Sequence, residues 1–200
     1  TRPRASDGGP AEPLNVVFVG SYENIASAAA RRGYRRVQAD EGVGQLAFGR
    51  PPDAVAFKRA QAGAPAIWVR LWSAPVRLQG QPVFVVQVGR PVGGRFVAEA
   101  SGAKRLHPDV DEARNLFVQD MMYSGGLERL GFVTGVGAAP RAQPRLAANG
   151  ASYFTDGLRA VLCFATRPLT ISDVHLLDWE PLLDERETTG PQERARAIQD

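Results

Sequence analysis

The sequence predicts an α+β domain, with a mixed, mainly antiparallel sheet and two principal helices packed on one face. Three observations support this prediction. Residues 105–126, RLHPDVDEARNLFVQDMMYSGG, have the apolar spacing and the end signals of a helix. An apolar run at 14–20 ends in glycine and leads into a second helical segment. Two alternating runs at 66–78 and 82–92 flank a Gln-Gly-Gln turn and indicate a β-hairpin.

Length and composition set the outer limits of the prediction. With 200 residues, 44% of them apolar, the chain can form one domain with a full hydrophobic core. We expect a flexible linker at 1–12, a single globular domain at 13–183 and a polar tail at 184–200. A net charge of +3 is too small and too scattered for a nucleic-acid footprint, so no nucleic acid is expected as a partner.

The first elements of the domain are a strand and a helix. The β-branched run LNVVFVG at 14–20 fits a buried strand. Ser21 is a suitable N-cap for a helix that continues to Arg32, and Gly33 supplies its end. Because this turn has one glycine and lacks G-x-G-x-x-G, it does not predict a nucleotide site.

The middle of the chain predicts strands. Residues 53–60 alternate and should form a short strand, the two runs of the hairpin follow, and 95–101 should add another strand. In the first run, one face is aliphatic and should meet the core, and the other is aromatic and basic. Pro75 and Pro82 predict a bend in the ladder. The core face carries Ile67, Val69 and Leu71, and the opposite face carries Trp68, Arg70 and Trp72.

The second helix has a well-defined start. Asp109 is the expected N-cap, and Glu112 three residues later gives the D-x-x-E form of a capping box. We expect Phe117 and Met121 to be buried on its apolar face. After it, 127–136 should be a strand, 137–152 a loop, 153–165 a turn and buried strand, and 172–179 an edge strand or short helix.

Six segments in order carry a family resemblance. They are PLNVVFVGSYENIASAAARRGY, LAFGRPPDAVAFKRA, WVRLWSAP, LQGQPVFVVQVGR, HPDVDEARNLFVQDM and YFTDGLRAVLCF. This set, from about residue 13 to about residue 165, resembles the LssY-like C-terminal domain, named after a component linked to type I secretion. The family has no established activity. The resemblance implies a bacterial domain tethered near a membrane, beside membrane-embedded segments of its parent protein or an envelope partner protein. Where the family pattern has a His pair before P-D-x-D, this chain has Lys104 and Arg105.

Histidine and carboxylates gather at the start of the second helix. His107 and Asp111, with Asp156 from the later turn, could serve as acid-base groups of a hydrolase acting on phosphorylated or lipid-derived substrates. Neighbouring acidic residues on a helix diverge by about 100°, so they do not converge on one ion, and we expect no metal and no cofactor. We favour the alternative that these carboxylates cap the helix and are otherwise solvated.

A second group of residues could line a ligand pocket. Tyr22 and Tyr153, with the basic Lys58 and Arg70, would suit an anionic or phospholipid-derived ligand. The alternative is half-buried tyrosines and two cations on a solvated sheet face. Cys163 lies in an apolar run and is expected to be a buried small hydrophobe rather than a nucleophile. The leading expectation is a non-catalytic accessory domain of a bacterial membrane or envelope protein that binds a partner or an anionic ligand.

Overall fold

The fold is built on one eight-stranded sheet. The computed structural model describes residues 4–5, 12–37, 45–61, 66–91, 107–147 and 151–177. Only the β12–β8 and β11–β2 pairs of this sheet are parallel, which confirms a mixed, mainly antiparallel sheet. In spatial order its strands are β12 (His175–Leu176), β8 (Leu127–Thr134), β11 (Leu158–Phe164), β2 (Val16–Val19), β7 (Gln81–Gly89), β6 (Ile67–Leu78), β5 (Ala54–Lys58) and β3 (Arg35–Val37).

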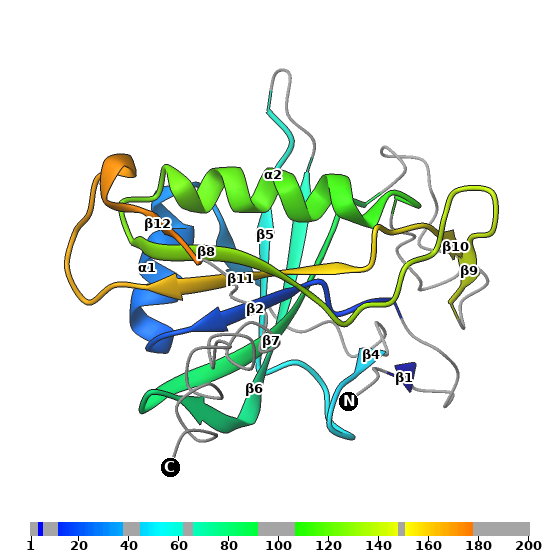
Figure 1. Ribbon diagram of the computed structural model, residues 1–200, viewed down its shortest axis with the longest axis horizontal. Helices are drawn as coiled ribbons and strands as arrows, with labels where there is room; N and C mark the ends of the chain where they lie inside the picture. Colours follow the sequence, from blue (N-terminus) through cyan, green and yellow to red (C-terminus); the bar gives the residue numbers. More distant parts are fainter. Residues whose placement is uncertain are drawn as a thin grey trace, which may run out of the picture.

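In the described parts of the chain, two α-helices cover one face of this sheet (Figure 1). They are α1 (Tyr22–Arg31) and α2 (Val110–Met122). Their N-caps are as expected: Ser21 Oγ accepts from the N–H of Asn24 at 3.2 Å, and the Asp109 carboxylate accepts from the N–H of Glu112 at 3.0 Å. Two small pairs lie outside the main sheet, β1 (Arg4–Ala5) with β4 (Gln45–Leu46) and β9 (Arg145–Leu146) with β10 (Ser152–Tyr153).

The main core lies between the helices and the sheet. Phe117 and Met121 of α2 are buried in it, as predicted. The alternation in β6 is confirmed too, because Ile67, Val69 and Leu71 are all buried on this face. The predicted bend appears as a shift in the β6–β7 register between Ser73 and Arg77, around Pro75.

Part of the other face of the sheet is also covered. Trp72 is fully buried and packs with Leu14 and Ala47, while the Trp68 ring lies on Phe57 with centroids 4.8 Å apart. The two tryptophans therefore do not form an open aromatic patch. Arg70, on the same face, is buried as well, so the alternative of a solvated sheet face is wrong for this residue.

The C-terminal segment agrees with both alternatives raised for residues 172–179. A single turn of 3₁₀ helix, η2 (Ile171–Asp173), is followed by the edge strand β12. The predicted strand at 95–101, most of the linker and the tail lie outside the described residues, and the domain boundaries stay predictions.

The turn after β2 requires glycine. Gly20 has a φ of +136°, and a Cβ there would lie 3.1 Å from the Phe164 carbonyl oxygen. Such a close approach between two backbone segments leaves no room for a side chain.

Candidate functional site

Asp111 and Asp156, two of the three predicted acid-base groups, meet around a buried arginine. Arg114 donates from Nη1 and Nη2 to the two Asp156 oxygens at 2.9 and 2.8 Å, and its Nη1 lies 3.2 Å from Asp111 Oδ1. Nη1 also donates to the Leu158 carbonyl at 2.8 Å. The Arg114 side chain is 2% exposed, so its charge depends on these acceptors for compensation.

Both carboxylates also accept hydrogen bonds from residues other than Arg114. Asp111 accepts from Thr155 Oγ1 at 2.8 Å and from the N–H of Asp156 at 2.6 Å. Asp156 accepts from the N–H of Leu158 at 2.7 Å. The hydrogen bonds from Arg114 lower the pKa of Asp156 below its usual range, which keeps it ionised. A carboxylate held in this way is a poor general acid or base near neutral pH, because it does not readily take up a proton.

His107, the third predicted group, belongs to a separate cluster at the start of α2. Its Nδ1 accepts from the N–H of Asp109 at 3.2 Å and lies 3.5 Å from Glu112 Oε2. Glu112 accepts two bonds from Arg90 Nη1, at 3.0 and 2.9 Å. In a complete capping box the Asp109 N–H would donate to the Glu112 side chain. Here it donates to His107 Nδ1 instead, so only one of the two predicted capping bonds forms.

Lys58, a predicted ligand-binding residue, is paired within the protein. Its Nζ donates to both oxygens of Asp120 at 2.8 and 2.6 Å. Tyr34 Oη donates to the same carboxylate at 2.9 Å, and Arg32 lies 3.5 Å from it. Burial, reinforced by the Asp120 charge, raises the pKa of Tyr34 well above its ordinary value, so the phenol stays a donor. This cluster fastens β5 and Tyr34 to α2.

Arg70 and Tyr153 lie in two further places. Arg70 donates to Gln87 Oε1 at 2.7 Å and is 3.9 Å from Glu12, on the sheet face opposite the helices; burial lowers its pKa. Tyr153 packs with Val110 and Ala147 in a small separate cluster. The four predicted ligand-binding residues are therefore spread over four places, and Tyr22 alone of them lines the pocket described next.

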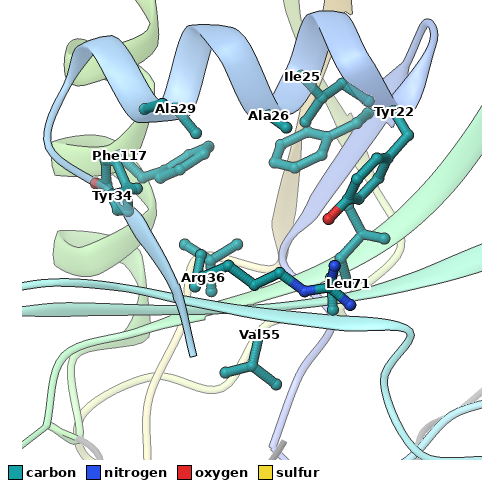
Figure 2. A pocket seen from close by; sticks show the side chains of 14 residues that line it. Tyr22, Ile25, Ala26, Ala29, Tyr34, Arg36, Val55, Leu71 and Phe117 are labelled. Carbon is teal, nitrogen blue, oxygen red and sulfur yellow. The ribbon is translucent and has the colours of Figure 1, made fainter. Parts of the chain in front are cut away.

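An apolar pocket of about 360 Å³ lies between α1 and the β3–β5–β6 end of the sheet. In Figure 2, α1 forms one wall, and its side chains point toward the sheet. Five alanines explain the space: Ala26, Ala29 and Ala30 on α1 and Ala54 and Ala56 on β5 line it, and none has a side chain long enough to fill it. Around them the walls are continued by Phe18, Ile25, Val55, Val69, Leu71 and Phe117.

Polar groups enter this pocket from three residues. The Tyr34 hydroxyl is bound to Asp120, which fixes its ring as a wall. Tyr22 and Arg36 also line the pocket, and in Figure 2 the Tyr22 hydroxyl and the Arg36 guanidinium lie toward the same end. Arg36 is exposed, so this end reaches solvent. The pocket therefore combines an apolar interior with one cationic, hydroxyl-bearing rim.

The single cysteine, Cys163, is not among the residues that line this pocket. Cys163 is half-buried rather than fully buried as expected, and this partial burial raises the pKa of its thiol, which is unfavourable for a nucleophile. Among the described residues, no three His, Cys, Asp or Glu side chains come together where a metal ion could be held. In the same part of the chain, no helix has the length and apolar content needed to cross a membrane.

Comparison with known proteins identifies the family. The family model described as LssY C-terminus matches residues 43–158, more than half of the chain. The chain belongs to the LssY C-terminus family. The match confirms the family resemblance and contains four of the six segments in full, while the first segment lies outside it and the last is covered in part. Of the pocket it covers β5, β6 and α2 but not β2, α1 or β3. A search of curated proteins and a search of solved structures each found no match.

Sequence reasoning missed two features of this LssY C-terminus domain. The partner of Asp111 and Asp156 is Arg114, for which the sequence analysis predicts no role. The pocket had one local signal, because the alanine-rich run 26–30 gives α1 an inner face with little volume. Arg36 gave no separate signal, since Arg35 beside it is equally basic and only the strand register decides which of them faces α1.

Proposed function

We propose that this LssY C-terminus domain is a non-catalytic accessory domain that binds an apolar ligand in the pocket between α1 and β5. The observation that carries the proposal is the pocket itself. Its volume of about 360 Å³ falls within the roughly 300–1,000 Å³ of small-molecule sites, and its lining is almost entirely apolar. Protein interiors pack closely and contain few large voids, so an apolar space of this size beside the core supports a ligand-binding role.

The positions of the predicted acid-base groups favour binding over the alternative, a hydrolase acting on phosphorylated or lipid-derived substrates. A hydrolase would need His107, Asp111 and Asp156 around one cavity that could hold a substrate. Instead the two aspartates surround Arg114, His107 lies with Glu112, and none of the three lines the pocket. These positions therefore support a ligand-binding role for the domain.

We further propose that the domain works at the bacterial cell envelope, beside membrane-embedded segments of its parent protein or with an envelope partner. The support is the context that the family resemblance implies, together with an apolar pocket whose ligands would be concentrated in a membrane. The test is fractionation of cells that express the natural full-length protein. Recovery in the membrane fraction is expected, and recovery only in the soluble fraction would contradict this part of the proposal.

The pocket proposal is tested with a neutral apolar fluorophore, N-phenyl-1-naphthylamine. We expect saturable binding to the wild-type domain with an increase in fluorescence. Ala26→Leu places three more carbons in the pocket and should abolish binding, with Ala56→Leu doing the same from the opposite wall. The matched control is Ser27→Leu, the same new side chain on the exposed face of α1. Absence of saturable binding to the wild type, or equal loss in the Ser27 control, would refute the proposal.

A further inference from the structure

The pocket has one end that differs chemically from the rest. Strand register places Arg36 directly opposite Ala56, and Ala56 packs against the core under the helices. Arg36 therefore lies on the face of β3 that points to α1. Its neighbour Arg35 alternates to the other face of the same strand. One of two adjacent arginines is thus directed to the pocket rim.

The polar groups at this rim have no acceptor for their hydrogen bonds within the described part of the chain. Neither Arg36 nor the Tyr22 hydroxyl makes a hydrogen bond or an ion pair there, whereas Arg32 and Lys58 share the single carboxylate of Asp120. Arg36 brings one positive charge to the open end of the pocket, so this end offers an anion a cation and two hydrogen-bond donors.

We propose that the natural ligand is an anionic single-chain amphiphile. Its hydrocarbon chain lies between the alanines of α1 and β5, and its carboxylate or phosphate head accepts from the Arg36 guanidinium and the Tyr22 hydroxyl. A pocket near the lower limit of small-molecule sites accommodates one chain rather than two. This inference rests on the proposed binding function and adds the ligand class.

The test is displacement of the neutral fluorophore by ligands of matched chain length. The set is decanoate, decyl phosphate, 1-decanol and decyltrimethylammonium, each below its micelle concentration. Because the rim is exposed, the charge should add a modest factor, and decanoate should displace the probe at about fivefold lower concentration than decanol. Decyltrimethylammonium should be the weakest. Lengthening the acid from eight carbons should tighten displacement by about fourfold per methylene until the pocket is full.

Two variants separate the specific contact from general charge. Arg36→Gln should remove the preference for decanoate over decanol and leave displacement by decanol unchanged. Arg35→Gln removes the same charge from the adjacent position on the opposite strand face and should keep the preference. Equal loss of preference in both variants would overturn the proposed contact. Tyr22→Phe should weaken decanoate and decyl phosphate alike, by a few-fold.

The outcomes distinguish this inference from the function on which it rests. If the fluorophore and decanol bind but decanoate has no advantage, the anionic head is refuted and the apolar pocket stands. If neither the fluorophore nor decanol binds, the proposed function fails as well. If 2-naphthoate, an aromatic acid without a hydrocarbon chain, binds more tightly than every chain-bearing acid, the proposal that the ligand has a hydrocarbon chain is refuted. A preference for decyl phosphate over decanoate, or the reverse, supports the inference and identifies the source of the head group.

Discussion

Replacing Arg114 by methionine tests the central ion-pair network of the domain. Methionine keeps most of the packing volume but removes the positive charge. The change removes the two hydrogen bonds that Arg114 donates to Asp156, the one it donates to the Leu158 carbonyl, and the positive charge beside Asp111. Loss of one partner from a buried ion pair costs roughly 3–5 kcal/mol, because the other charge stays buried.

The structure places this variant at the lower end of that range. The Asp156 side chain is 44% exposed and that of Asp111 is 17% exposed, so water can partly replace Arg114 at the first. We expect Arg114→Met to lower the free energy of unfolding by about 3 kcal/mol. For a domain of this size that corresponds to a fall in melting temperature of about 6–12 °C.

Urea unfolding followed by tryptophan fluorescence, repeated from pH 7 to pH 3, measures the effect. Arg114 lowers the pKa of Asp156 in the folded state, so its stabilisation is fully present above the unfolded pKa of about 3.9 and is lost as pH falls through the lower folded value. The difference between wild type and variant should therefore shrink toward pH 3. Arg129→Met, an exposed arginine on β8, is the control and should change stability little. A loss under about 1 kcal/mol, or one independent of pH, would refute the network as the cause.

Three further predictions concern the helix start, a tight turn and metal binding. Asp109→Ala removes the bond to the N–H of Glu112 and should cost about 1 kcal/mol in urea unfolding; no loss would contradict the cap. Gly157→Ala should cost about 1–3 kcal/mol from strain alone at φ +89°, plus a clash with Ala138 N, which would lie 2.6 Å from the new Cβ. Gly49→Ala, at φ +73° with open space, is the control that isolates the clash. A chelator should leave the melting temperature unchanged, and a fall reversed by one divalent ion would revive a metal site at the start of α2.

The sequence predicted those features that depend only on residues close to one another along the chain. The faces of β6 follow from a period of two, so Ile67, Val69 and Leu71 could be assigned to the core before any partner strand was known. The Asp109 cap involves residues three apart and needs no tertiary information. The bend near Pro75 follows from the missing N–H of proline.

Features that depend on distant segments could not be predicted in the same way. Arg70 was assigned to a ligand or to solvent, yet it is buried and lies beside Gln87 and Glu12, which are distant from it in sequence. Arg114 pairs with Asp156, which lies 42 positions later in the sequence, so no local pattern predicts this ion pair. The pocket depends on how far α1 stands from β5, which is decided by packing elsewhere, and alanine on a helix is equally compatible with close approach.

The position of β2 in the middle of the sheet determines when its two edges can pair as the chain is synthesised. Its Val16 pairs with Val86 on one side and with Ala160 on the other. During synthesis the β7 side can close early, but the β11 side must wait until nearly all of the described chain has left the ribosome. Until then VVFV presents an apolar, unpaired edge, the kind of segment that invites aggregation. The family match, residues 43–158, omits β2 and reaches only the first residue of β11. A fragment limited to that span would therefore lack the pairing of β2 with β7 and β11.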